Sequence, residues 1–309
     1  QRYNINPDRI LLAGFSMGGA GAWQLGLRRP DLFCGLEINA GVIGSRFPAE
    51  RPAFDQLTPV EKAGMVGYGM TVDHALSLSH LPIVAFAGEN DSQLAASVSI
   101  REQLVREGFS IEQTGPHQWQ GRDLNALFLV HPNAGHAHPT GETQRLRDEY
   151  NAANFLRGRV VPDRIRYVTY STRYNRSHWV TIDGLERHFN RAAIDATRDA
   201  ARTNFTITTS NISRLQLSDM SEARRIAIDG ETLAVTPAAT IQLERVNQRW
   251  RVSTGSVTAG ALRKQHGLQG PVNDAFLDAF LCVTPTGRAF NQVAERRGRQ
   301  EFERFSAMF

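Results

Sequence analysis

Residues 8–23 read DRILLAGFSMGGAGAW, and this stretch decides the fold of the first half of the chain. Residues 10–13 are an apolar run without polar alternation, which is typical of a strand buried on both faces of a parallel sheet. Residues 14–18 match the pattern Gly-x-Ser-x-Gly, and apolar side chains then recur at helical spacing until Pro30 ends the helix. Strand, tight turn and helix in this order indicate a nucleophile elbow.

The elbow predicts a chemical role for Ser16. A strained turn at the end of the strand would project the Ser16 hydroxyl above the sheet. The N-terminus of the following helix would direct the backbone N–H of Met17 at the place where an oxyanion forms. A glycine-rich structural turn is the alternative, because a chain of this length contains Gly-x-Ser-x-Gly by chance about one time in ten.

Four glycines surround the serine, and we expect each of them to be required by close packing. Gly14 and Gly18 would flank the turn because a side chain there would collide across it. Gly19 and Gly21 would let the helix lie close to the strand.

The composition is that of an ordinary soluble protein: 309 residues, 41% hydrophobic, 21% charged and a net charge of +4. The arginines are scattered along the chain, which argues against a nucleic-acid partner. Cys34 and Cys282 lie far apart, so they indicate neither a metal site nor a redox compartment. No apolar run is long enough for a membrane span.

The chain begins at Gln1 directly before the elbow strand, so we expect it to be an internal fragment. The strands that precede the elbow and the second oxyanion donor would then be missing. An isolated fragment would be poorly soluble and close to inactive. Because the start of the chain would be lost, the localisation stays open, with an extracellular or periplasmic location among the options.

Strands and helices alternate through the first half of the chain, which predicts an α/β fold with a parallel, doubly wound sheet. The expected strands are 31–39, 81–87, 110–114 and 123–131, and the expected helices are 94–107 and 141–156. Residues 42–80 are rich in Gly and Pro, and we interpret them as an insertion over the active-site face. This part would form a first domain, 1–160.

Short alternating segments dominate residues 164–254 and predict a small antiparallel β-domain, a sandwich over 161–257. Asp183-Gly184 and Asp229-Gly230 are turn signals between its strands. Residues 258–309 would begin a further α/β segment, with a candidate strand at 276–283 and a charged helix from Ala289.

Serine near neutral pH needs a base, and that base needs a third group to hold it. Asp91 lies on the turn after the strongest apolar strand, and His136 lies in a Gly-His turn before the last helix of this part. Loops at the carboxyl ends of parallel strands converge on one crevice, so Ser16, Asp91 and His136 can meet there.

Two neighbours compete for these roles. Glu89 could replace Asp91 as the acid, and His138 could replace His136 as the base. His136 is preferred because the small residue before it allows close approach. His136, His138 and Glu142 could also suggest a metal site, but His-x-His alone is a weak signal, and we expect neither a metal nor an organic cofactor.

The segments DRILLAGFSMGGAGAW, LPIVAFAGENDS and HPNAGHAHP resemble the nucleophile, acid and histidine regions of prolyl-oligopeptidase-type serine hydrolases and their esterase relatives. The resemblance covers residues 5–157 and implies a partial α/β-hydrolase fold, with Ser16 as nucleophile, Asp91 as acid and His136 as base. The β-rich part follows this region, whereas prolyl oligopeptidases carry their accessory domain before it.

The sequence therefore predicts a serine hydrolase that cleaves an ester or a peptide bond of a small-molecule or peptide substrate through an acyl-enzyme. The hypothesis from another class is a non-catalytic binding or adhesion protein with a degenerate hydrolase core. Reactivity of Ser16 toward a fluorophosphonate separates the two.

Overall fold

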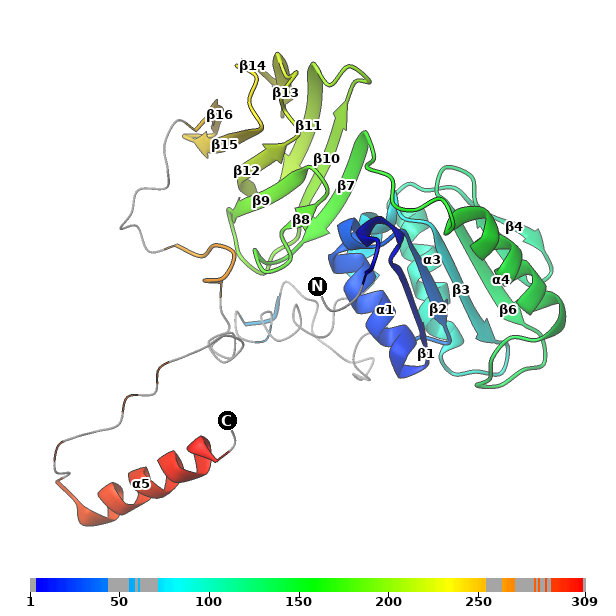
Figure 1. Ribbon diagram of the computed structural model, residues 1–309, viewed down its shortest axis with the longest axis horizontal. Helices are drawn as coiled ribbons and strands as arrows, with labels where there is room; N and C mark the ends of the chain where they lie inside the picture. The colour runs from blue at the N-terminus through cyan, green and yellow to red at the C-terminus, as the bar shows by residue number, and fades with distance from the viewer. Residues whose placement is uncertain are drawn as a thin grey trace. The chain divides into compact units, whose positions relative to one another are not determined.

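The computed structural model describes residues 4–43, 56–58, 61, 72–253, 263–269, 281, 283, 287 and 290–307. The chain divides into two compact units, Gln1–Gln269 and Gly270–Phe309. The first unit contains a six-stranded sheet with helices on both faces, an α/β arrangement, and two further five-stranded sheets (Figure 1). Within the described ranges, no helix has the length and apolar character needed to cross a membrane.

The six-stranded sheet has the strand order β1-β2-β3-β6-β5-β4. Its strands are β1 (Leu11–Phe15), β2 (Gly35–Asn39), β3 (Ile83–Gly88), β4 (Ile111–Gly115), β5 (Gln118–Gly121) and β6 (Ala126–His131). The first three strands and β6 run parallel, as expected, but β5 and β4 are antiparallel to their neighbours. The expectation of an entirely parallel sheet is therefore wrong at this edge. Only two residues link β4 to β5, which is enough for a hairpin and too few for a parallel crossover.

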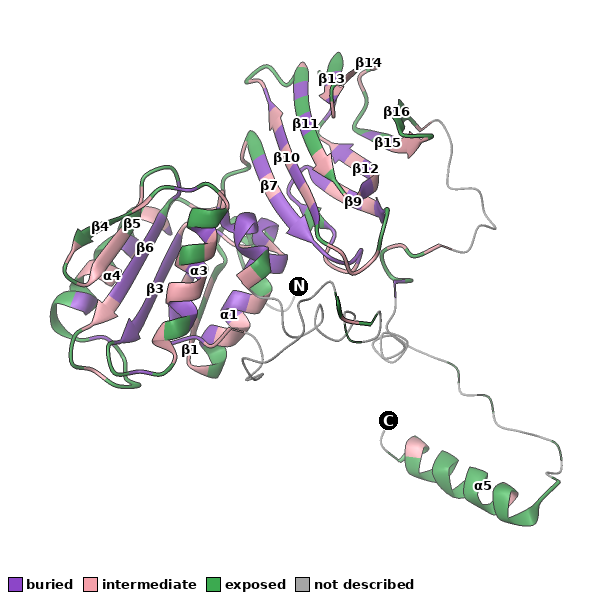
Figure 2. Ribbon diagram, turned by 180° about the vertical axis from the view of Figure 1, so that it is seen from behind, coloured by how far each residue is buried: buried purple, intermediate pink, exposed green. Residues whose placement is uncertain are grey.

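Three helices of the described ranges cover the sheet: α1 (Met17–Arg28), α3 (Leu94–Arg106) and α4 (Gly141–Asn154). Helices α1 and α3 pack on one face, where Trp23 and Ile100 join the core with Ile83 and other strand residues. Helix α4 packs on the opposite face, where Tyr150 lies against Val84 and its neighbours. Strand β3 is buried throughout, as predicted for a central strand (Figure 2).

Strand β1 differs from the prediction of a strand buried on both faces. It lies at the edge of the sheet, and Leu11 is 39% exposed. In the part of the chain that the structure describes, β1 pairs only with β2. The apolar run thus predicted a strand correctly but did not predict how buried it is, because burial depends on which elements lie beside the strand.

Residues 42–80 were expected to cover the active-site face, and this is wrong for the segment η4 (Val72–Leu78). This 3₁₀-helix is largely buried and packs against α1, α3 and the first strand of the next sheet. It leads into the amino end of β3, whereas the candidate active site lies at the carboxyl ends of the strands. Residues 44–55, 59–60 and 62–71 lie outside the described ranges. Two further 3₁₀-helices in the described part of the chain are η1 (Pro7–Arg9) and η2 (Pro30–Leu32).

The strands after residue 163 form two five-stranded sheets, β14-β13-β11-β10-β7 and β16-β15-β12-β9-β8. Their bounds are β7 (Arg164–Thr169), β8 (Arg176–Ser177), β9 (Val180–Leu185), β10 (Ala192–Arg198), β11 (Asn204–Ser210), β12 (Ile212–Ser218), β13 (Arg225–Ile228), β14 (Glu231–Ala234), β15 (Thr240–Val246) and β16 (Arg249–Val252). All pairs are antiparallel except β11 with β13. One core, which includes Trp179 and Trp250, is shared by side chains from both sheets.

The two Asp-Gly turn signals had different outcomes. Asp229 and Gly230 both have positive φ and connect β13 to β14, as a two-residue hairpin requires. Asp183 and Gly184 lie inside β9 instead, so that prediction was wrong. The strand pairing is irregular beside Gly184, where an added Cβ would lie 2.7 Å from the Ser213 hydroxyl oxygen. This glycine serves close backbone approach in a strand rather than a turn.

Buried histidines occur where the α/β part meets β7 and β8. The His74 ring donates a hydrogen bond from Nδ1 to the Val168 carbonyl oxygen at 3.1 Å. Burial lowers the pKa of His74 to about 3, and it lowers the pKa of His80 to about 3 and that of His178 to about 4. The ordinary value is 6.5. At pH values between 6.5 and the lowered pKa of each histidine, the unfolded chain binds protons that the folded chain does not. The free energy of unfolding therefore falls as the pH falls through this range.

We expect the variant His74→Asn to reduce this pH dependence. Asparagine can keep the hydrogen bond to Val168 through Nδ2, but it does not titrate. The slope of the free energy of unfolding between pH 6 and pH 4 should be shallower by about 1.4 kcal/mol per pH unit than in the wild type. Urea denaturation at a series of pH values measures the slope for each protein. Equal slopes for the variant and the wild type would contradict the lowered pKa of His74.

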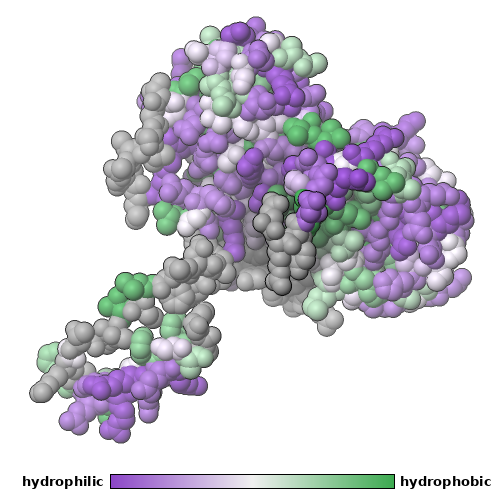
Figure 3. All heavy atoms as spheres, viewed as in Figure 1, coloured by the Kyte–Doolittle hydropathy of each residue, from purple (hydrophilic) through white to green (hydrophobic). Residues whose placement is uncertain are grey.

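The second unit contains the helix α5 (Gln292–Ser306), which agrees with the charged helix expected from Ala289. None of its described residues is buried, and its surface is largely polar (Figure 3). The candidate strand at 276–283 lies almost entirely outside the described residues.

Candidate active site

Ser16 occupies the turn between β1 and α1 in a strained backbone conformation. Its φ is 56° and its ψ is −115°, values that cost a residue with a side chain about 1–3 kcal/mol. The Ser16 N–H donates to the Asn39 carbonyl oxygen at the end of β2, at 2.8 Å. The neighbouring strand therefore holds the turn in place.

The glycines around Ser16 were predicted correctly at two of four positions. A Cβ on Gly14 would lie 2.1 Å from the Gly18 carbonyl oxygen, and a Cβ on Gly19 would lie 2.7 Å from the Gly41 Cα. Gly18 and Gly21 have open space where a Cβ would be, so the collisions expected there do not occur. Gly19 brings α1 close to the end of β2 rather than to its own strand.

Asp91 follows β3 and is almost completely buried, with a side chain that is 2% exposed. Its Oδ1 accepts the Gln93 N–H at 2.9 Å, and its Oδ2 lies 2.8 Å from His136 Nδ1. The first hydrogen bond fixes the carboxylate, so that its other oxygen is directed at the histidine.

His136 lies in the loop between β6 and α4 and joins the other two residues. Its Nε2 is 2.9 Å from the Ser16 Oγ. Because a carboxylate only accepts hydrogen bonds, Nδ1 donates to Asp91, and Nε2 of the neutral ring can accept the serine proton. The structure thus brings together Ser16, Asp91 and His136, three residues that lie far apart in the sequence.

The two competing residues have other contacts. Glu89 Oε2 accepts the Asn133 N–H at 2.8 Å, which ties the acid turn to the histidine loop. The His138 ring stacks on Phe15, with ring centroids 4.2 Å apart. Phe15 also contacts the His136 ring, at 4.8 Å. Glu89 and His138 therefore border the three-residue chain without being part of it.

Gly88 is a close-packed position beside the candidate site that sequence reasoning missed. A Cβ at this last residue of β3 would lie 2.2 Å from the Gly135 carbonyl oxygen. The turn at residues 88–91 can approach the loop at residues 131–136 this closely because Gly88 has no side chain. The sequence signal was a glycine directly after a buried strand, which often marks close backbone approach.

We expect Gly88→Ala to push the Asp91 turn away from the His136 loop. A displacement of about 1 Å between reacting groups lowers a rate by about 100-fold, so kcat for an ester substrate should fall by about that factor. Gly135→Ala is the matched control, because an added Cβ there meets nothing within 4 Å. If Gly88→Ala were as active as Gly135→Ala and the wild type, the close approach of Gly88 to Gly135 would not matter for activity.

The backbone N–H of Met17 is at the first position of α1, where no carbonyl of the helix can accept it. In the described part of the chain it donates to no other acceptor either. The positive end of the helix dipole lies at the same place. A developing negative charge next to Ser16 Oγ would be stabilised by both. Among the described residues, no three His, Cys, Asp or Glu side chains are grouped so that they could hold a metal ion.

Comparison with known proteins shows no matching family model and no matching curated protein. Among solved structures, a ferulic acid esterase is 18% identical, with a TM-score of 0.32, over 50% of this chain and 54% of that chain. SOBER1 from Arabidopsis thaliana is 16% identical, with a TM-score of 0.27, over 50% and 54%. Esterase PE8 is 18% identical, with a TM-score of 0.27, over 50% and 51%. The chain thus spans about half the length of these structures.

Proposed function

We propose that this protein is a serine hydrolase that cleaves an ester or amide bond through an acyl-enzyme. The observation that carries the proposal is the continuous hydrogen-bonded chain from Asp91 Oδ2 through His136 to Ser16 Oγ, with distances of 2.8 and 2.9 Å. A serine at a strained turn, a base at its hydroxyl and a buried acid behind the base are the parts that nucleophilic catalysis requires.

In the first step, Ser16 Oγ attacks the substrate carbonyl carbon while His136 Nε2 takes the serine proton. The carbonyl oxygen becomes an oxyanion, and the Met17 N–H at the helix N-terminus donates a hydrogen bond to it. Asp91 holds the ring and stabilises its positive charge. The tetrahedral intermediate collapses, and His136 passes the proton to the leaving alcohol or amine.

Water completes the reaction. His136 takes a proton from the water molecule, the resulting hydroxide attacks the acyl carbon, and Ser16 leaves with a proton returned by His136. The products are the free acid and a regenerated serine. The His136 side chain is 39% exposed, so water can reach the ring.

The test is labelling with a fluorophosphonate, which reacts only with an activated serine. We expect one phosphonylated peptide, located by mass spectrometry at Ser16, and loss of labelling after heat denaturation. Absence of labelling in the folded protein, or a label on another serine, would overturn the proposal and favour a non-catalytic binding protein.

Short acyl esters are the first substrates to assay, because an alcohol leaves more easily than an amine and demands less transition-state stabilisation. Aminoacyl amides are the second. Turnover of esters alone identifies an esterase, and turnover of both extends the activity to the peptidase that the sequence resemblance implies.

A further inference from the structure

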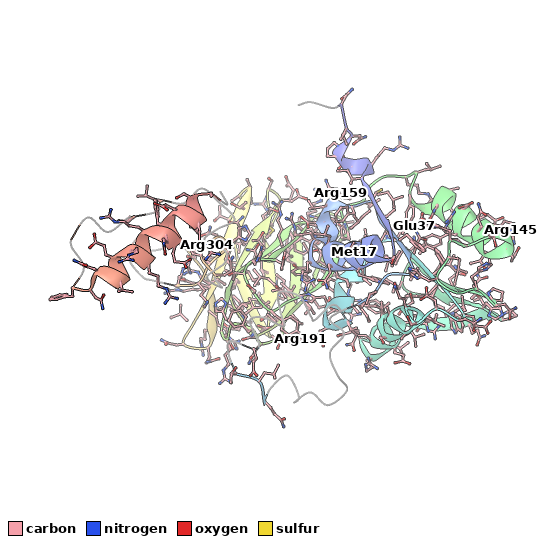
Figure 4. All side chains as sticks on the ribbon, turned by 90° about the horizontal axis from the view of Figure 1, so that it is seen from below. Met17, Glu37, Arg145, Arg159, Arg191 and Arg304 are labelled. Atoms are coloured by element: carbon pink, nitrogen blue, oxygen red, sulfur yellow. The ribbon has the colours of Figure 1, made fainter. Side chains whose placement is uncertain are left out.

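A carboxylate lies on the second strand of the six-stranded sheet, beside the strand that leads to Ser16. Glu37 is the central residue of β2, which pairs with β1 on one side and β3 on the other. The adjacent side chains, Leu36 and Ile38, belong to the core under α1 and α3. By the alternation of a strand, Glu37 points to the opposite face, which α4 covers. Figure 4 shows Glu37 between Met17 of α1 and Arg145 of α4.

Three polar side chains surround the Glu37 carboxylate, which is 14% exposed. Asn39 Nδ2 donates to Oε1 at 2.9 Å, and Asn151 Nδ2 of α4 donates to Oε2 at 2.6 Å. Arg147 Nη1 lies farther away, at 3.9 Å from Oε1. The guanidinium of Arg147 is closer to Asp148, at 2.7 Å. The two asparagine amides are thus the main partners of Glu37, rather than an ion pair.

Asn39 connects this network to the nucleophile. Its backbone carbonyl oxygen accepts the Ser16 N–H at 2.8 Å, and the next residue, Ala40, has a φ of 45°. Its side-chain Oδ1 is buried and has no hydrogen-bond partner in the described part of the chain. Among the residues that the structure describes, the hydrogen bond to Glu37 is thus the one that holds the Asn39 amide group.

Helix α4 carries the other end of the network, and it starts directly after the loop that contains His136. Glu37 consequently links the element behind the histidine to the residue that holds the serine. Without this carboxylate, the buried Asn39 amide would lose its hydrogen-bond partner, which is unfavourable. The half-buried Asn151 would lose its link to β2.

We propose that Glu37 is a positioning residue for Ser16, acting through Asn39 and tied to α4 through Asn151. The proposal rests on the hydrolase function proposed above. Glu37 touches no reacting atom; it holds the Asn39 carbonyl where it fixes the strained conformation of Ser16 and hence the distance from Oγ to His136.

The kinetic test compares Glu37→Ala and Glu37→Gln, with p-nitrophenyl acetate as substrate. In Glu37→Ala, kcat should fall by about 10- to 100-fold, while KM changes little, because geometry and not binding is lost. Glu37→Gln should stay within about threefold of the wild type. Its carbonyl can accept from Asn151, and its amide can donate to Asn39 Oδ1 after that amide rotates. Glu112→Ala, in the same sheet and paired with Arg122 at 3.1 Å, is the control.

A second readout does not depend on activity. Amide hydrogen exchange at Ser16 should be about 10-fold faster in Glu37→Ala, because its N–H donates to the Asn39 carbonyl, while β10 and β11 should be unchanged. Unchanged exchange at Ser16 would overturn the proposal whether or not the protein is an enzyme. Faster exchange with unaltered kcat would also overturn it, because Glu37 would then be structural only.

A wild type that shows this protection but turns over no ester and resists fluorophosphonate would overturn the hydrolase function instead. A fall in kcat that glutamine does not rescue would contradict the hydrogen-bonding role of Glu37.

Discussion

In a preparation that turns over an ester substrate, replacing Ser16 with alanine should lower kcat by a factor on the order of 10⁶. The Ser16 Oγ is the atom that lies 2.9 Å from His136 Nε2, and alanine removes it. Asp91 cannot substitute as nucleophile, because its carboxylate is buried and both of its oxygens are hydrogen-bonded. The measurement is the initial rate as a function of substrate concentration, after the rate of uncatalysed hydrolysis has been subtracted.

The fold of Ser16→Ala should be unchanged. The serine hydroxyl lies outside the apolar cores, and alanine keeps the backbone N–H that donates to Asn39. Thermal unfolding within about 2 °C of the wild type is expected. A variant that kept more than about a tenth of the wild-type kcat would show that another residue is the nucleophile.

The pair His136→Ala and His138→Ala should differ by several orders of magnitude. Loss of His136 removes the base and should cost about as much as loss of Ser16, again on the order of 10⁶ in kcat. Loss of His138 removes a ring that stacks on Phe15, a contact worth about 0.5–1.5 kcal/mol in stability. We expect its kcat to stay within about threefold of the wild type.

Steady-state kinetics of both variants, with fluorophosphonate labelling rates as a second measure, test this difference. If His138→Ala were the inactive variant, the hydrogen bond between His136 and Ser16 would not be the catalytic one. The loop would then have to rearrange when substrate binds.

The candidate site was accessible to sequence reasoning because its parts lie at recognisable positions. Ser16, Asp91 and His136 each follow a strand of one sheet, and the turns that carry them have local signals. The sequence favoured Asp91 over Glu89 by its position in the turn, but the directions of two side chains in one turn are decided by the backbone geometry.

Supporting residues were harder to predict. The sequence pattern gives no reason to distinguish Gly18 and Gly21 from Gly14 and Gly19. In the structure, however, an added Cβ at Gly18 or Gly21 would lie in open space. Gly88 went unnoticed, although it lies against Gly135. A glycine's importance depends on what faces its missing side chain, and that neighbour can come from a segment 47 residues away, as Gly135 does from Gly88.

The sequence by itself determined the type and the order of most elements. Apolar runs identified β2, β3 and β6, helical spacing identified α1, α3 and α4, and Gly-x-Ser-x-Gly placed the turn between β1 and α1. These features are local, because backbone propensity and side-chain periodicity act over a few residues.

Tertiary structure alone decided the rest. It buried η4 against β7 and placed Glu37 of β2 against Asn151 of α4. Burial, strand order and the meeting of Ser16 with His136, 120 residues apart, depend on which distant segments share a surface. Such contacts result from packing the whole sheet, and no local pattern encodes them.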